Sequence, residues 1–431
     1  MSYTEIMDYM YSRLPMFHRI GPPAYKPDLK NAIALCELLG NPQKNFRSIH
    51  IAGTNGKGSV AHMLAAILQK KGLRVGLYTS PHLRDFRERV RVNGKKISKS
   101  YFIAFIRKYQ PDFDKIDPSF FEMTVGLAFQ YFSDQQVDIA VIETGLGGRL
   151  DSTNIIDPLL TVITNVSLDH TQLLGNTVAK IATEKAGIIK TGIPVVIGET
   201  HAETVNIFRK VAKSHGCPIT FADKIYDARN IHPAGNRARN LVLDLFKGEE
   251  LHIRHISSPL PGLYQAKNII TVLAACDALN EQGFGLSEED FKVGIRDTIR
   301  MTQLRGRWQI LSRKPLIVCD TGHNESGLAA VVEQIGLTPH ANLHIVFGIV
   351  SDKPVDEMLK ILPRSATYYF CKADIPRGLD ATELERKAAE FSLKGKIYPS
   401  VKSAFESAKK KASPGDMVFV GGSSFVVAEV I

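Results

Sequence analysis

The chain has 431 residues, enough for two or three domains, and its 44% hydrophobic and 23% charged residues are those of a globular protein. No apolar run reaches the roughly 18 residues of a membrane span, so we expect no membrane partner. The net charge of +10 is compatible with an anionic small-molecule substrate or with nucleic acid, but no block of five consecutive basic residues is present.

The N-terminal residues and the cysteines bear on the cellular compartment. The segment MSYTEIMDYM carries Glu5 and Asp8 and lacks the apolar region of a signal peptide. The five cysteines are scattered and contain no CxxC pair, which is typical of thiols in a reducing cytosol. We therefore expect a cytoplasmic protein.

Strand-like and helix-like segments alternate along the first half of the chain. A helix opens at Pro27-Asp28 and ends at Gly40. The strands that we predict after it are Ser48–Ala52, Leu73–Tyr78, Val137–Glu143, Leu160–Thr164 and Ile193–Gly198, and the helices are residues 119–132 and Thr177–Lys190. This alternation favours a P-loop-type, doubly wound and mostly parallel α/β sheet.

The pattern then changes twice. Residues 217–260 are polar and rich in turns, which predicts small antiparallel pieces at the sheet edge, and a long helix follows over Leu263–Asn280. An arginine-rich stretch without apolar periodicity predicts a linker near residues 299–303. The strands predicted beyond it are Leu316–Cys319, Leu343–Phe347, Thr367–Phe370 and Met417–Val420. We therefore predict two domains, residues 1–300 and a smaller Rossmann-like α/β domain over residues 301–431.

A glycine-rich turn, Gly53-Thr54-Asn55-Gly56-Lys57-Gly58-Ser59, lies between the first strand and its helix. Glycines let backbone N–H groups approach an anion, and the helix N-terminus adds partial positive charge. Lys57 is placed to reach the terminal phosphates of a nucleotide, and Ser59 to offer a hydroxyl to Mg²⁺. Because Ile51 stands where the general P-loop pattern has its first glycine, an ordinary glycine-rich turn remains the alternative.

Polar side chains also follow two later strands. Glu143 ends an apolar strand, and His170 comes shortly after the next one. Ligands bind at the carboxyl ends of parallel strands, so Glu143 is a candidate Mg²⁺ ligand and His170 either a ligand or a structural histidine. Lys185 lies beside Glu184 on a predicted helix, and by itself this pair favours a solvated ion pair.

The motifs around these residues resemble those of the Mur ligase superfamily, specifically of its folylpolyglutamate synthases and dihydrofolate synthases. The three motifs are GTNGKGS, ETGLGGRLDSTN, which begins at Glu143, and TNVSLDHTQLLG, which contains His170. The resemblance extends from about residue 18 to residue 430. It implies that ATP phosphorylates the carboxylate of dihydropteroate or a reduced folate, and that L-glutamate displaces phosphate from this acyl phosphate. It also implies a monomer with no nucleic-acid partner.

The resemblance implies particular residue roles. The implied ATP-binding residues are Thr54, Asn55, Gly56, Lys57, Gly58, Ser59, Asn268, Arg307, Asp320 and His323. Two Mg²⁺ sites are implied at Ser59, Ser80, Glu143, His170 and Lys185. Lys185 is expected to be carbamylated, since CO₂ converts a neutral amine into an oxygen ligand. The implied folate-binding residues are Ser80, His82, Phe121 and Asp151, although Phe121 is equally consistent with core packing. The implied catalytic residues are Lys57, His170, Lys185 and Arg307.

Some residues depart from the family pattern, and other functions stay open. Tyr264 stands where the family has His, Arg305 where it usually has Pro, and Thr321-Gly322 where it has Gly-Ala. The nearest rival function is a Mur-type ligase acting on a cell-wall nucleotide precursor, against which the SPHL and FFEMT segments argue. A P-loop ATPase without ligation is the rival from a different class, and nucleic-acid binding is third.

Overall fold

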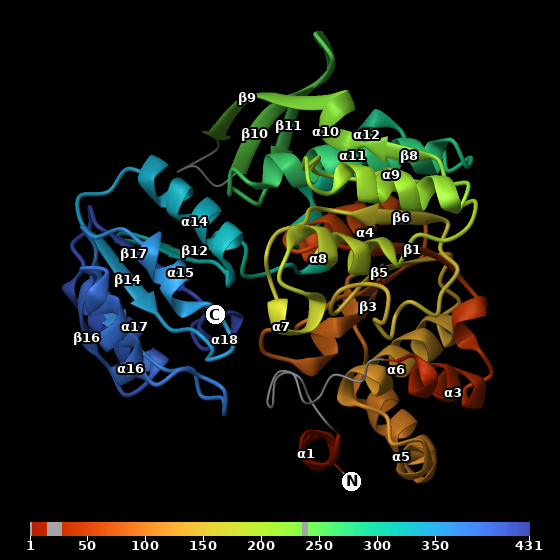
Figure 1. The fold of residues 1–431 in the computed structure, drawn as a ribbon, viewed down its shortest axis with the longest axis horizontal. Helices are drawn as coiled ribbons and strands as arrows, with labels where there is room; N and C mark the ends of the chain where they lie inside the picture. Colours follow the sequence, from red (N-terminus) through yellow and green to blue (C-terminus); the bar gives the residue numbers. More distant parts are fainter. Residues whose placement is uncertain (1, 15–27, 235–239) are drawn as a thin grey trace. The chain divides into compact units, whose positions relative to one another are not determined.

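The computed structural model describes residues 2–14, 28–234 and 240–431 of the chain (Figure 1). They form two compact units. The first comprises Met1–Ile231, Val242–Pro259 and Gln265–Gln303, and the second His232–Leu241, Leu260–Tyr264 and Leu304–Ile431. Within the described residues, no helix is long and apolar enough to cross a membrane.

The first unit is built on an eight-stranded sheet with the order β4-β3-β2-β5-β1-β6-β7-β8. Its strands are β1 (Arg47–Ala52), β2 (Val75–Tyr78), β3 (Val90–Val92), β4 (Lys95–Lys96), β5 (Ile139–Glu143), β6 (Leu160–Ile163), β7 (Val195–Ile197) and β8 (Ile219–Phe221). All neighbours from β2 to β8 pair in parallel, which confirms the predicted mostly parallel sheet.

The connectivity of this sheet creates a switch point at β1. The chain runs from β1 outward to β2, returns to β5, and then crosses to β6 on the other side of β1. Ile51 of β1 is in register with Glu143 of β5 and with Val162 of β6. The carboxyl ends of β1, β2, β5 and β6 therefore share one edge of the sheet, where α/β folds bind ligands.

Helices cover both faces of this sheet. One face carries α4 (Lys57–Lys70) and α11 (Gln265–Asn280), and α12 (Glu288–Arg296) packs against α4. The other is packed against α5 (Lys99–Ile116), α6 (Phe120–Asp134), α8 (Val178–Ala186) and α9 (Val205–Ser214). The remaining helices are α1 (Tyr3–Arg13), α3 (Lys30–Leu38), α7 (Thr171–Leu174), α10 (Ala222–Ile225) and α13 (Thr298–Thr302), with short 3₁₀ turns at Pro42–Lys44 and Phe86–Arg89. Figure 1 shows α3, α5 and α6 close to one another. Their buried residues belong to one hydrophobic cluster, which includes Phe102 and Phe129.

The region 217–260 differs in two respects from the antiparallel pieces predicted at the sheet edge. The strand β8 is parallel to β7, not antiparallel, because the crossover helix α9 brings it back in the same direction. The strands β9 (Tyr226–Ala234), β10 (Asn240–Lys247) and β11 (Glu250–Ser258) form a separate sheet with the order β11-β10-β9. Pro27, where a helix was predicted to open, lies outside the described residues.

The second unit contains a six-stranded sheet with the order β12-β13-β17-β14-β15-β16. The strands β13 (Leu316–Cys319), β17 (Met417–Gly421), β14 (Leu343–Phe347) and β15 (Thr367–Phe370) confirm the four predicted ones, with β17 one residue longer. The sequence missed β12 (Gln309–Arg313) and β16 (Lys394–Ile397), which are partly exposed edge strands without an apolar run. The helices are α14 (Glu325–Leu337), α15 (Val355–Lys360), α16 (Ala381–Glu390), α17 (Val401–Lys411) and α18 (Ser424–Ala428).

Candidate active site

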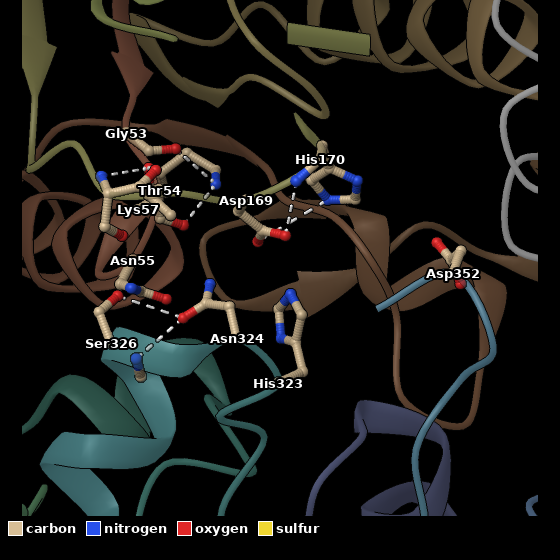
Figure 2. Close-up of polar contacts among 12 residues, drawn as sticks. Gly53, Thr54, Asn55, Lys57, Asp169, His170, His323, Asn324, Ser326 and Asp352 are labelled. Carbon is tan, nitrogen blue, oxygen red and sulfur yellow. Dashed lines mark hydrogen bonds and ion pairs between the residues drawn. The ribbon is translucent and has the colours of Figure 1, made fainter. Parts of the chain in front are cut away.

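The glycine-rich turn joins β1 to α4 and is closed by its own lysine. The Lys57 ammonium donates to the carbonyls of Gly53 (3.0 Å) and Thr54 (3.2 Å), as Figure 2 shows. The loop is also held to the end of β6, because the Asn55 N–H donates to the side-chain oxygen of Asn165 at 3.0 Å. The turn is thus a fixed loop at the switch point of the sheet, with an ammonium group folded against it.

Two amide side chains of α11 support the loop. Gln265 donates to the Ser59 hydroxyl at 3.2 Å, and Asn268 donates to Gln265 at 2.8 Å. Gly56 begins α4 with a φ of 83°, and a Cβ there would lie 2.3 Å from the Asn268 side-chain oxygen. The close approach of Asn268 therefore requires glycine at position 56, both for its φ and for its missing side chain.

A substitution at this glycine tests whether the packed loop binds a nucleotide. Gly56→Ala is expected to weaken the binding of an ATP analogue at least tenfold, or about 1.4 kcal/mol, because the methyl group displaces Asn268 and the loop. Gly72→Ala is the matched control, since Gly72 also has a positive φ (95°) but a Cβ there meets nothing within 4 Å. Both variants carry the cost of a left-handed alanine, about 1–2 kcal/mol of stability. Titration calorimetry that gave both variants the same affinity would contradict the assignment.

Glu143 and Ser80 meet at the same sheet edge. Glu143 is the last residue of β5 and is buried, and its Oε2 accepts the backbone N–H of Ser80 at 3.1 Å. Ser80 follows β2 in the chain, and β2 pairs directly with β5. The parallel pairing thus brings together two residues that are 63 positions apart in the sequence.

His170 is carried by the segment that follows β6. This segment is tied to the glycine-rich turn through Thr54, whose hydroxyl donates to the Ser167 carbonyl and accepts the Ser167 N–H, both at 3.1 Å. His170 has a φ of 49°, and its N–H donates to the Asp169 carboxylate at 2.8 Å (Figure 2). The arrangement places an imidazole and a carboxylate on the loop that contacts the candidate nucleotide turn.

Lys185 is buried on α8 and is not part of a solvated ion pair. Its neighbour Glu184 pairs instead with Arg149 at 2.9 Å, while Lys185 is only 3% exposed. Burial, and to a lesser extent the nearby Lys57 ammonium, lowers the pKa of Lys185 to about 7, while Asp169 and Asp151 oppose the shift. A substantial fraction of this amine is therefore neutral near pH 7, which is the form that reacts with CO₂.

The residues predicted for the folate pocket lie around the ends of β2 and β5. His82 accepts the Nε–H of Arg89 at 2.8 Å, and its pKa is lowered to about 3 by burial and by the Arg89 guanidinium. Phe121 is partly buried and lies edge-on to Tyr78, with ring centroids 6.2 Å apart. Asp151 is buried, and its carboxylate accepts hydrogen bonds from Gly145, Leu146 and Thr153.

The second unit holds Arg307, Asp320 and His323. Asp320 follows β13 and is buried, and it accepts hydrogen bonds from the Tyr264 hydroxyl (2.5 Å) and the Trp308 N–H (2.6 Å). Burial raises the pKa of Asp320, and the Arg307 guanidinium opposes this shift. The His323 ring lies 3.0 Å from the Thr321 carbonyl. Tyr264, the residue that departs from the family pattern, thus anchors Asp320 directly.

Sequence reasoning did not single out several buried polar residues of the first unit. Arg89 contacts His82, and Thr153 joins His50 to Asp151. One signal was available, because His50 is a polar residue in the strand Ser48–Ala52, where polar and apolar residues alternate. Its side chain is fully buried. The partners of these side chains depend on tertiary contacts that periodicity does not report.

Two family descriptions match the chain. Residues 51–276 match the Mur ligase middle domain, and residues 306–424 match the glutamate ligase domain of Mur ligases. The dihydrofolate synthase/folylpolyglutamate synthase of Bacillus subtilis is 34% identical over 94% of both chains. A probable bifunctional folylpolyglutamate synthase/dihydropteroate synthase of Haloferax volcanii is 36% identical, and the chain spans only 48% of its length.

Solved structures of folylpolyglutamate synthases also match the whole length of this chain. E. coli FolC in complex with DHPP and ADP superimposes with a TM-score of 0.85 at 29% identity, and the match covers 100% of this chain and 97% of that one. A bifunctional folylpolyglutamate synthase/dihydrofolate synthase with Mn, AMPPNP and L-glutamate bound gives a TM-score of 0.83 at 29% identity, with coverage of 100% and 97%.

Proposed function

Because this chain belongs to the Mur ligase superfamily, and within it to the folylpolyglutamate synthase/dihydrofolate synthase family, we propose that it ligates L-glutamate to a folate-type carboxylate with ATP. The observation that carries the proposal is that the glycine-rich turn closed by Lys57 lies at the same sheet edge as the buried Glu143 carboxylate. The buried Lys185 amine is close enough to Lys57 for their charges to interact. The relatives crystallised with ADP, AMPPNP, DHPP and L-glutamate support the choice of substrates.

The reaction begins with phosphoryl transfer. The substrate carboxylate attacks the γ-phosphorus of ATP, the bond to the bridging oxygen breaks, and ADP leaves. Lys57 stabilises the charge that develops on the transferred phosphoryl group. The residues that we propose for ATP are Thr54, Asn55, Gly56, Lys57, Gly58, Ser59 and Asn268 in the first unit, and Arg307, Asp320 and His323 in the second.

Amide formation follows from the resulting acyl phosphate. The amine of glutamate attacks the acyl carbon, phosphate departs with its bonding electrons, and the ammonium loses a proton to solvent. The acyl phosphate is prone to hydrolysis, so the chain has to exclude water while the amine approaches. We assign the folate pocket to Ser80, His82, Phe121 and Asp151, and dihydropteroate and reduced folates are the substrates proposed for it.

The donor set at the sheet edge fits magnesium. Glu143 offers a buried carboxylate, and hydroxyl and carboxylate oxygens are the ligands that Mg²⁺ prefers. We propose that Ser59, Ser80, Glu143, His170 and Lys185 hold two Mg²⁺ ions. Bound there, magnesium supplies positive charge to the phosphate oxygens.

Lys185 fits this set only after modification, because a buried ammonium repels a cation. We propose that its neutral amine attacks the carbon of CO₂, forming a C–N bond and releasing one proton to solvent. The product is a carbamate with two oxygens and a negative charge. The lowered pKa of Lys185 supports this step, since the neutral amine is already available near pH 7.

We further propose two domains, residues 1–300 and residues 301–431. We also propose that the protein is a monomer in the cytoplasm. Five cysteines without a disulfide support the compartment. Nucleic acid has no role in this proposal.

A three-substrate assay tests the function. ADP release is expected only with glutamate and a folate carboxylate together, measured separately with dihydropteroate and with tetrahydrofolate. ATP turnover without glutamate would favour a non-ligating ATPase. Turnover with a cell-wall nucleotide precursor in place of the folate would favour another Mur-type ligase.

A further inference from the structure

A buried aspartate organises the loop that follows Glu143. Asp151 is 3% exposed, and its Oδ2 accepts the backbone N–H groups of Gly145 and Leu146, both at 2.8 Å. Its Oδ1 accepts the backbone N–H of Thr153 at 3.0 Å and the Thr153 hydroxyl at 2.5 Å. Four donors surround the two oxygens, and this arrangement favours the ionised carboxylate although burial raises the pKa of Asp151.

The Thr153 hydroxyl has a second partner in the interior of the sheet. Its oxygen lies 2.8 Å from Nε2 of His50, and both residues are fully buried. The hydroxyl has a single proton, which it gives to Asp151, so His50 must be the donor in the other contact. Burial and the Lys190 charge lower the pKa of His50 to about 3, so this ring is neutral, with its proton on Nε2. Nδ1 has no hydrogen-bond partner among the described residues.

The organised loop connects two of the proposed metal ligands. Its first end continues directly from Glu143 at the end of β5. At its other end, the Arg149 N–H donates to the Glu184 carbonyl at 2.8 Å, and Asn154 donates to the Gly187 carbonyl at 3.0 Å. These carbonyls flank Lys185 at the end of α8. The conformation of the loop therefore determines the position of Glu143 relative to Lys185.

We propose that Thr153 and His50 are positioning residues of the metal site: their hydrogen-bonded chain holds Asp151, and Asp151 fixes the loop between Glu143 and Lys185. The inference rests on the proposed function for the identity of the metal ligands. Thr153 and His50 belong to neither the folate pocket nor the set of metal ligands proposed above, whereas Asp151 is also assigned to the folate pocket. Groups that hydrogen-bond a metal ligand typically change metal affinity or activity by about 10–100-fold when they are lost, and Thr153 and His50 act on Glu143 through Asp151 and the loop.

Thr153→Val and Thr153→Ser form a matched pair. Valine keeps the shape of threonine and removes the hydroxyl, whereas serine keeps the hydroxyl. Binding of Mn²⁺ is measured by electron paramagnetic resonance in the presence of AMPPNP, so that the readout does not depend on turnover. Thr153→Val is expected to weaken Mn²⁺ binding about 10–100-fold, whereas the Mn²⁺ affinity of Thr153→Ser is expected to stay within about threefold of wild type. Thermal unfolding of each variant separates this loss from a loss of the fold.

His50 provides an independent pair if Thr153→Val does not fold. Gln at position 50 can present an N–H near the position of Nε2, and Leu cannot. His50→Leu is expected to lose Mn²⁺ affinity and His50→Gln to retain most of it. Equal Mn²⁺ affinity within either folded pair overturns the proposal. If wild type itself binds no Mn²⁺ with AMPPNP, the metal assignment fails, and the inference that rests on it fails for that separate reason.

Discussion

Lys57→Ala is expected to reduce the rate of glutamate-dependent ADP formation by about 10²–10³-fold, the range for removing one group that stabilises transition-state charge. The ammonium now lies against the carbonyls of Gly53 and Thr54, inside the turn that we assign to the phosphates. Its removal takes away positive charge where phosphoryl charge develops. The side chain is only half-buried and is not part of the hydrophobic core, so the fold should remain. Steady-state rates and the unfolding temperature test both parts.

Lys70→Ala is the control for this variant. Lys70 is exposed in the last turn of the same helix, α4, so its removal changes the net charge by the same amount at the far end. It should leave the rate within about twofold of wild type, as expected for a surface substitution. Comparable rates for the two variants would contradict the role of the turn.

Lys185→Arg is expected to be inactive, with a rate at least about 100-fold below wild type. Losing a group that only supports a metal ligand already lowers metal affinity or activity roughly 10–100-fold, and Lys185 is proposed as a ligand itself. Arginine keeps its charge at all relevant pH values and cannot take up CO₂. Lys185→Ala should also lose activity, and acetate should restore part of it by supplying a carboxylate in the vacated space. Lys180→Arg, at an exposed position on α8, is the control and should behave as wild type. An active Lys185→Arg enzyme would refute carbamylation.

The pKa of Lys185 gives the same hypothesis a pH dependence. The shift to about 7 means that the amine is protonated below this value and neutral above it. Activation of CO₂-depleted enzyme by added CO₂ should therefore speed up as the pH rises through about 7. An activation rate that is independent of pH from 6 to 8, or no response to CO₂, would count against a carbamate, since the neutral fraction changes several-fold over that range.

The sequence was sufficient where local patterns decide the structure. Apolar strands that end in polar motifs predicted the parallel sheet, and the strand Leu316–Cys319 was predicted to the residue. The helix predicted over Thr177–Lys190 ends earlier, at Ala186, because Gly187 and the residues after it turn back to contact the loop around Arg149 and Asn154. β16 was missed because an exposed edge strand such as Lys394–Ile397 has no apolar run to reveal it.

Part of the candidate site could also be predicted from local sequence patterns, and part of it could not. Motifs at strand ends indicated Ser59, Glu143 and His170, since parallel strands bring such residues to one edge. The burial of Lys185 reversed the reading of that residue as half of a solvated pair with Glu184. The chain from His50 through Thr153 to Asp151 joins residues 103 positions apart, and no local pattern reports such a contact.

Transfer of oxygen from the folate carboxylate to phosphate tests the central claim most directly. Dihydropteroate or tetrahydrofolate, labelled with oxygen-18 in the carboxylate that accepts glutamate, is incubated with ATP, glutamate and the enzyme. Attack of that carboxylate on the γ-phosphorus predicts that the released phosphate carries one labelled oxygen for each amide formed, as read by mass spectrometry. Unlabelled phosphate released without a glutamate adduct would mean that water attacks ATP and that the protein is not this ligase.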